Sequence, residues 1–200
     1  MEDATSGNMT GLIDWIVKVA NVYGEDARIL FYYAGHGIPD ESNGAAYLLP
    51  TDVSGKNVSG AYKLSRLYAT LGALPAKDVT VFIDACFSGS RRGNGMLASA
   101  RGVAIKAKNE NPTGKMVVFS AAKDDETAFP YAEKGHGLFT YYLLKKLQET
   151  EGNVDYGTLG DYINKEVSRR SIVVNNKLQT PTISPSPQMG ENWKKLKLSK

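Results

Sequence analysis

The chain has 200 residues and a formal net charge of +3, and it is 42% hydrophobic and 22% charged. This size and composition are typical of one globular domain with a sizeable core. The mild charge does not indicate a nucleic-acid partner. No apolar run reaches the roughly 18 residues of a membrane span, so we expect no membrane partner. The first residues are neither basic nor apolar, so we expect no signal peptide, and the sequence assigns no localisation.

The first half of the chain predicts alternating helices and strands. Apolar residues at helical spacing begin after Asn8, a suitable N-cap, and stop at Gly24. Two later runs are apolar almost throughout, as expected for strands that are covered on both faces. The predicted elements are a helix over residues 9–23, a strand over 28–34, a short strand over 45–49, a helix over 64–74 and a strand over 79–84.

The second half continues the alternation after a long basic loop. Residues 88–115 contain glycines and basic residues without clear periodicity, and loops of this length are uncommon unless they are functional. After this loop we predict a strand over 116–121, a helix that opens near Gly137, a helix capped by Thr158 and an edge strand over 181–184. We expect a single domain over residues 1–184 and a basic, proline-containing tail over residues 185–200.

Strands that alternate with helices predict a mostly parallel sheet with helices on both faces. Such sheets place function at the carboxyl ends of their strands. One predicted strand ends just before His36, and the other ends just before Cys86, the only cysteine. A thiol and an imidazole are therefore expected at the same edge of one sheet. This pair is typical of cysteine-dependent hydrolysis, because the imidazole can activate the thiol and protonate the leaving amine.

Four segments carry a family resemblance: residues 32–37 (YYAGHG), 84–89 (DACFSG), 119–122 (FSAA) and 135–140 (GHGLFT). With a histidine about 50 residues before the cysteine, they resemble the caspase-like cysteine peptidases of the peptidase C14 type. Asp84 stands where caspases have Gln, which indicates the bacterial metacaspase-like branch that cleaves after Arg or Lys. The resemblance implies an α/β fold of the caspase type, a three-layer sandwich around a mostly parallel sheet.

The resemblance also implies roles for the site residues. Cys86 is the expected nucleophile and His36 the expected general acid–base. The backbone N–H groups of Gly37 and Cys86 are the expected oxyanion donors. Asp84 should point to the same face of its strand as Cys86 and is expected to pair with a substrate Arg or Lys. Ser120, at the end of the next strand, is the second residue expected to bind substrate.

A structural alternative exists for each of these residues. Cys86 is compatible with a buried core thiol, His36 with a histidine that only satisfies a turn, and Asp84 with a solvated or turn-capping carboxylate. His136 is the alternative base, although it follows the cysteine and precedes a helix. The loop over residues 88–115 is either a site of self-processing or a solvated connection.

The family normally has a strand, a helix and a second strand before the segment that begins near residue 9. Nothing upstream of Asn8 supplies them, so we expect an N-terminal fragment or a partner chain to complete the sheet and contribute to the specificity pocket. Calcium activates some metacaspase-like enzymes, but the acidic residues do not follow an EF-hand spacing. One cysteine and two histidines cannot supply a usual zinc site, so we predict no metal and no cofactor.

The leading hypothesis is a cysteine endopeptidase whose substrate is a peptide or protein with a basic residue before the cut. One alternative is a catalytically silent caspase-like module that acts in protein interaction or signalling. The other is a related cysteine hydrolase with a non-peptide or Asp-containing substrate.

Overall fold

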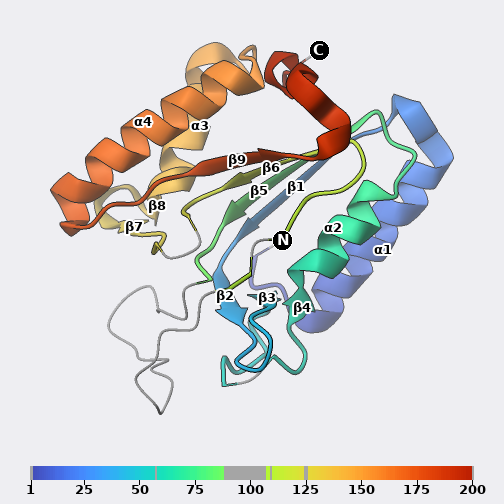
Figure 1. The fold of residues 1–200 in the computed structure, drawn as a ribbon, viewed down its shortest axis with the longest axis horizontal. Helices are drawn as coiled ribbons and strands as arrows, with labels where there is room; N and C mark the ends of the chain where they lie inside the picture. Colours follow the sequence, from blue (N-terminus) through green and yellow to red (C-terminus); the bar gives the residue numbers. More distant parts are fainter. Residues whose placement is uncertain (1, 57, 88–106, 109, 124–125, 200) are drawn as a thin grey trace.

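The computed structural model describes residues 2–56, 58–87, 107–108, 110–123 and 126–199, and it has one central sheet (Figure 1). In this sheet β1 (Arg28–Ala34), β5 (Asp78–Asp84) and β6 (Met116–Ser120) run parallel to one another. β9 (Thr182–Pro185) pairs with β6 in the antiparallel direction. The order β1-β5-β6-β9 confirms the predicted mostly parallel sheet.

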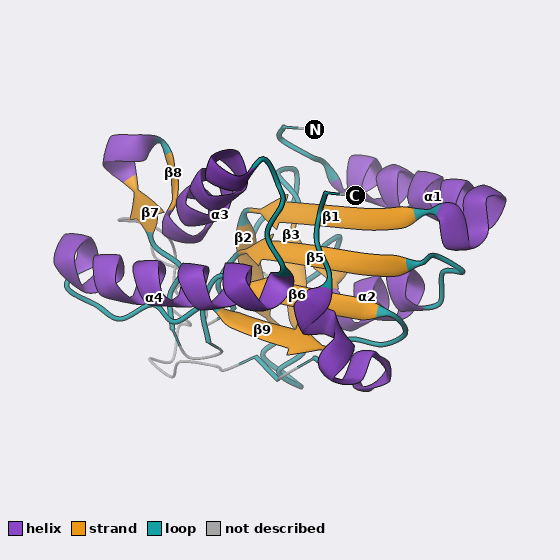
Figure 2. Ribbon diagram, turned by 90° about the horizontal axis from the view of Figure 1, so that it is seen from above, coloured by secondary structure: helices purple, strands orange, loops and turns teal. Residues whose placement is uncertain are grey.

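Helices cover both faces of this sheet (Figure 2). α1 (Ser6–Tyr23) and α2 (Leu64–Gly72) pack on one face, and α3 (Leu138–Thr150) and α4 (Tyr156–Asn175) pack on the other. The predicted three-layer α/β sandwich is therefore confirmed. β5 is apolar on both sides and is covered on both. The same cover was expected for β1, but Leu30 and Tyr32 on one of its faces are exposed.

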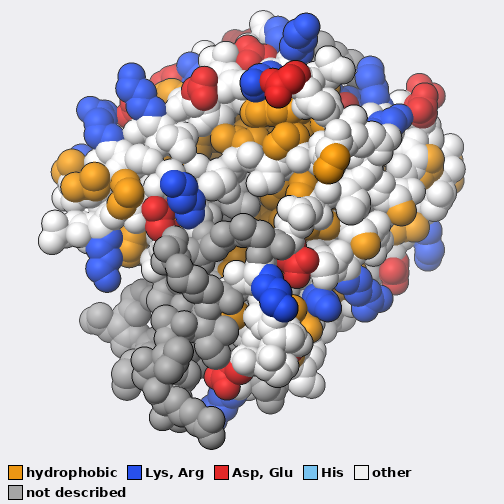
Figure 3. Space-filling model, in the orientation of Figure 1, with side chains coloured by type: hydrophobic (Ala, Val, Ile, Leu, Met, Phe, Trp, Pro, Cys, Tyr) orange, Lys and Arg blue, Asp and Glu red, His pale blue; other side chains and the backbone are white. Residues whose placement is uncertain are grey.

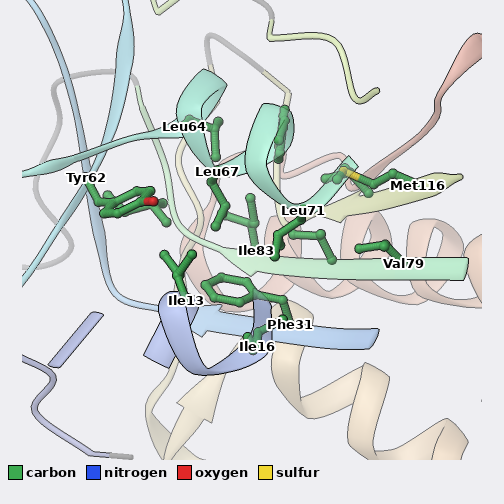
Figure 4. Packing of buried hydrophobic residues seen from close by; sticks show 14 of the residues in the cluster. Ile13, Ile16, Phe31, Tyr62, Leu64, Leu67, Leu71, Val79, Ile83 and Met116 are labelled. Carbon is green, nitrogen blue, oxygen red and sulfur yellow. The ribbon is translucent and has the colours of Figure 1, made fainter. Parts of the chain in front are cut away.

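One apolar cluster lies between the sheet and the α1–α2 layer (Figure 4). Ile13 and Ile16 of α1 and Leu67 of α2 face Phe31 of β1 and Ile83 of β5. Every residue of β5 is buried, since this strand lies between neighbouring strands and beneath helices on both faces. β5 is therefore a rigid support for the residues that follow it.

A second apolar cluster lies between the sheet and the α3–α4 layer. The rings of Phe82 and Phe119 lie 4.9 Å apart, and Phe119 meets Tyr156 of α4 edge-on at 5.4 Å. Cys86 belongs to this cluster. The cysteine therefore lies on the α3–α4 side of the sheet.

The starts of two helices depend on local capping. Thr5 caps α1 and forms a capping box with Asn8, so this helix begins at Ser6 and not after Asn8. The prediction that Thr158 caps α4 was wrong. Asp155 is the cap, because its carboxylate accepts both the backbone N–H of Thr158 at 2.8 Å and the Thr158 hydroxyl at 2.9 Å.

The region between β1 and α2, where the sequence predicted one short strand, forms a small antiparallel sheet. Its strands are β2 (His36–Pro39), β3 (Ala46–Leu49) and β4 (Tyr62–Lys63). A hairpin of β7 (Pro130–Tyr131) and β8 (His136–Gly137) precedes α3. Three short 3-10 segments complete the described elements: η1 (Gly24–Asp26), η2 (Ala132–Lys134) and η3 (Pro187–Lys195). η3 lies in the expected tail, and its Trp193 packs against the second cluster.

β1 forms one edge of the described sheet, and Leu30 and Tyr32 on this strand are exposed. It stays a prediction that a strand from an N-terminal fragment or a partner chain pairs with β1 at this edge. Figure 3 shows Lys and Arg side chains interspersed with Asp and Glu side chains over one face. Among the described residues, we find no helix that combines the length and the hydropathy of a membrane span.

Candidate active site

The neighbouring parallel strands β1 and β5 end just before His36 and Cys86. Ala34 of β1 pairs in register with Asp84 of β5, and the N–H of Gly35 donates to the carbonyl oxygen of Asp84 at 3.1 Å. His36 and Cys86 each lie two residues beyond this pair. The fold thus brings two segments that are distant in the sequence to the same edge of the sheet.

The two segments touch at Gly37. A Cβ atom built on Gly37 would lie 2.8 Å from the carbonyl oxygen of Cys86 and even closer to the ring of Phe87. A side chain at this position would have to displace one of these groups, so the close approach requires glycine. His36, the first residue of β2, is exposed beside this contact.

Tyr33 fixes the backbone that carries His36. The Tyr33 hydroxyl lies 2.8 Å from the carbonyl oxygen of His36 and 3.0 Å from that of Leu49, and it donates to this pair of acceptors. The Tyr33 ring folds back over Gly35, where a Cβ atom would lie 2.7 Å from the hydroxyl oxygen. Each glycine that flanks His36 therefore permits a close packing contact.

Cys86 is buried, with 3% of its surface exposed, and it forms no disulfide. It packs into the α3–α4 cluster, which also contains Phe82 of β5. In this conformation the sulfur is shielded from solvent. This burial is what the alternative interpretation of Cys86, as a thiol of the core, predicts.

Asp84 is also buried, at 1% exposed, and the start of α3 holds its carboxylate. Thr140 donates to Oδ2 of Asp84 through its hydroxyl at 2.5 Å and through its N–H at 3.3 Å. Gly137, the N-cap of α3, lies so close that a Cβ atom there would overlap Oδ2. α3 has no side-chain cap from its own N-cap residue, so the carboxylate from β5 supplies the negative charge that a helix N-terminus favours.

Asp84 lines a pocket of about 330 Å³ on the α3 side of the sheet. Tyr32 and Ala34 of β1 form one wall, and Thr140 with the β7–β8 hairpin forms another. His136, the second histidine, also lines this pocket. The volume is at the lower end for ligand pockets, which start at about 300 Å³, and it suits one long side chain more than a large cofactor.

A buried glutamine holds the hairpin wall of this pocket in place. Gln179 donates from Nε2 to the carbonyl oxygen of Ala121 at 2.8 Å, and its Oε1 accepts the N–H of Phe129 at 2.8 Å. The N–H of Leu138 donates to the carbonyl oxygen of Phe129 at 3.0 Å. The end of β6, the residue before the hairpin and the start of α3 are therefore tied together.

Ser120 is not among the residues that line the Asp84 pocket. It pairs in register with Ile83, and Ile83 packs into the α1–α2 cluster. Side chains alternate between the two faces along a strand, so Asp84 and Ser120 face opposite sides of the sheet.

Tyr32 and Thr140 line the pocket, although neither was predicted as a site residue. Tyr32 lies two residues before Ala34 and therefore shares its face of β1, a signal that the sequence does contain. Thr140 has no such signal, because its contact with Asp84 depends on how α3 docks against the sheet.

Most of the loop over residues 88–115, where self-processing is predicted, lies outside the described residues. Near its end, the N–H of Lys108 donates to the carbonyl oxygen of Gly44 at 2.7 Å. Within the described part of the chain, no group of three or more His, Cys, Asp or Glu side chains is arranged to hold a metal ion.

Solved structures share this fold. The crystal structure of a Geobacter sulfurreducens protein matches with a TM-score of 0.64 at 22% identity, over 98% of this chain and 78% of that one. Caspase-1 from Spodoptera frugiperda matches with a TM-score of 0.56 at 19% identity, over 88% of this chain and 67% of that one. No curated protein matches the sequence at a significant level.

A sequence model of the caspase domain of peptidase family C14 matches residues 1–189. The match includes the segments of His36 and Cys86, the Asp84 pocket and the four α-helices of the described residues. The structural matches agree with it in fold. The chain therefore belongs to the caspase domain family of cysteine peptidases.

Proposed function

We propose that this chain is a cysteine endopeptidase that cleaves peptide bonds after Arg or Lys. The observation that supports this most is the register of Ala34 with Asp84, which brings the segments of His36 and Cys86 to one sheet edge. The acidic pocket beside that edge supports the preference for a basic side chain, because a carboxylate forms strong, charge-assisted hydrogen bonds with Arg or Lys.

In the proposed reaction, the Cys86 thiol gives its proton to His36, and the thiolate attacks the carbonyl carbon of the peptide bond. A thioester forms on Cys86, the C–N bond breaks, and His36 passes the proton to the leaving amine. Water then hydrolyses the thioester and restores the thiol. The backbone N–H groups of Gly37 and Cys86 are the proposed oxyanion donors, each worth about 3 kcal/mol in the transition state.

The test is a panel of fluorogenic peptides that differ only in the residue before the cut: Arg, Lys, Gln or Asp. We expect hydrolysis of the Arg and Lys peptides, none of the Gln or Asp peptides, and no activity in Cys86→Ala. Hydrolysis of the Asp peptide alone would favour a related hydrolase of different specificity. Activity that survives in Cys86→Ala would contradict the assignment of the nucleophile.

A catalytically silent caspase-like module is the second candidate, and the burial of Cys86 favours it. An Arg-directed acyloxymethyl ketone separates the two candidates, because it forms a thioether only with an accessible, activated thiol. Mass spectrometry should find one adduct, on Cys86. No adduct on the native chain, together with full alkylation by iodoacetamide after unfolding, would support the silent module.

Self-processing within residues 88–115 is a further proposal, supported by the length and the basic residues of this loop. Wild type and Cys86→Ala are incubated side by side and their masses compared. We expect fragments that end in Arg or Lys from the wild type only. Identical intact masses would remove the proposal.

A further inference from the structure

Tyr32 lies at the side of the Asp84 pocket, and 44% of its surface is exposed. It is separated from Ala34 by one residue of β1, and Ala34 pairs in register with Asp84 of β5. Because alternate residues of a strand share a face, Tyr32, Ala34 and Asp84 point toward the same layer, that of α3. The tyrosine is therefore placed to contact whatever enters the pocket.

The Thr140 hydroxyl joins Tyr32 to Asp84. Thr140 Oγ1 lies 2.5 Å from Oδ2 of Asp84 and 2.7 Å from the phenolic oxygen of Tyr32. An ionised carboxylate can only accept hydrogen bonds, so with Asp84 in this form Thr140 donates its single hydroxyl proton to it. The proton in the second hydrogen bond must then come from Tyr32.

This assignment fixes the chemistry of the Tyr32 oxygen. Its only proton points to Thr140, so it makes any further polar contact as an acceptor. The pocket then presents two acceptors next to each other, the Asp84 carboxylate and the Tyr32 phenol, each within hydrogen-bonding distance of Thr140 Oγ1. Such a pair is suited to a cation that carries several N–H donors in one plane.

Arginine and lysine use such a pair differently. The guanidinium group is planar and offers five N–H donors in a rigid fork, so it can contact a carboxylate and a neighbouring acceptor at once. The ammonium group of lysine is a compact charge with a strongly held hydration shell, and it gains less from a second acceptor. A ring beside the pocket also offers its face to guanidinium.

We propose that Tyr32 is a specificity-determining residue, whose phenolic oxygen accepts a hydrogen bond from a substrate arginine and makes the pocket prefer Arg to Lys. This inference rests on the proposed function, since it concerns the side chain that precedes the cut. In it Asp84 supplies the charge, Thr140 is a positioning residue that orients both acceptors, and Tyr32 discriminates between the two basic side chains.

The kinetic test compares matched peptides with Arg or Lys before the cut on wild type and Tyr32→Phe. Removing one hydrogen bond to a charged group should lower kcat/KM for the Arg peptide about tenfold and leave the Lys peptide within about twofold. Tyr23→Phe is the matched control, because Tyr23 is an exposed tyrosine at the end of α1. Tyr23→Phe should leave kcat/KM unchanged for both peptides. Equal loss for both peptides in Tyr32→Phe, or no loss for either, would overturn the inference.

A binding test separates this inference from the proposed catalysis. In the Cys86→Ala background, NMR titration with N-acetyl-arginine amide and N-acetyl-lysine amide measures the pocket without any hydrolysis. Tighter binding of the arginine amide, lost in Tyr32→Phe, would support the inference even if no peptide were cleaved. If the peptides are cleaved but Tyr32→Phe leaves the ratio of kcat/KM for Arg and Lys unchanged, the inference is overturned. The proposed peptidase activity would still stand.

Discussion

Thr140, in the first turn of α3, donates its hydroxyl proton to Asp84, at the end of β5, across 2.5 Å. Both residues are buried, at 6% and 1% exposed. The contact therefore fixes α3 against the sheet and orients the carboxylate of the pocket with one hydrogen bond. The stability of the fold and the proposed specificity for a basic residue would therefore depend on the same pair of atoms.

Replacing Thr140 by Val removes this hydroxyl without changing the shape of the side chain. A hydrogen bond to a charged group contributes about 1.5–3 kcal/mol, so we expect the free energy of unfolding to fall by about 2 kcal/mol. Urea unfolding measures this change, and the Arg peptide should be cleaved more slowly. Thr140→Ser, which keeps the hydroxyl, should restore both. Equal stability of Thr140→Val and wild type would contradict the buried hydrogen bond.

Gly137→Ala tests how tightly Asp84 packs on α3. The added methyl group would overlap Oδ2 of Asp84, and overpacking of this kind costs about 1–3 kcal/mol. We expect a lower melting temperature together with weaker cleavage of the Arg peptide. Gly11→Ala is the contrasting control, because Gly11 is exposed in α1 with no atom near its Cβ position. It should stabilise the chain by about 1 kcal/mol.

The two histidines should differ in their effect on turnover. His36 follows β1 beside the Cys86 segment, whereas His136 lines the Asp84 pocket. Loss of a general acid–base costs about 10²–10⁴-fold in rate, so we expect His36→Ala to lower kcat by about that factor. His136→Ala should act mainly on KM. A larger loss of kcat in His136→Ala than in His36→Ala would reverse the two assignments.

Asp155 predicts a pH-dependent contribution to stability. The N–H of Thr158 donates to its carboxylate and lowers the pKa of Asp155 below its ordinary value. The cap therefore stabilises the fold at pH values above the ordinary Asp pKa and loses this effect as the pH falls through the lowered folded-state pKa. Asp155→Ala should cost about 1 kcal/mol at neutral pH.

The difference between wild type and Asp155→Ala, measured by urea unfolding, should shrink as the pH approaches about 2, well below the reference pKa near 3.9. Asp155→Asn keeps a side-chain oxygen that can accept the Thr158 N–H. The amide does not ionise, so the cap in Asp155→Asn should not depend on pH. The difference in free energy of unfolding between wild type and Asp155→Asn should therefore also change in favour of the variant as the pH falls. A constant difference for Asp155→Ala across this range would contradict the ionised cap.

The strands and the layers could be predicted from the sequence, because hydrophobic patterning is local. Residues 79–84 are apolar on both sides, and β5 is buried on both faces as this pattern predicts. Residues 28–34 predicted the same cover, but Leu30 and Tyr32 on one face of β1 are exposed. The same reasoning placed His36 and Cys86 just past two strand ends. The start of α4 could not be predicted in this way, because both Asp155 and Thr158 are suitable N-cap residues and the structure uses Asp155.

What the sequence determined by itself is the sheet, its layers and the edge at which His36 and Cys86 leave it. Only the tertiary structure decided the pocket: that Asp84 meets Thr140 and Tyr32, that Ser120 faces the opposite layer, and that Cys86 is buried. The physical reason is the separation along the chain of the residues that interact. The apolar and polar pattern of a strand acts between neighbouring residues, whereas the docking of α3 depends on contacts between residues far apart in the chain.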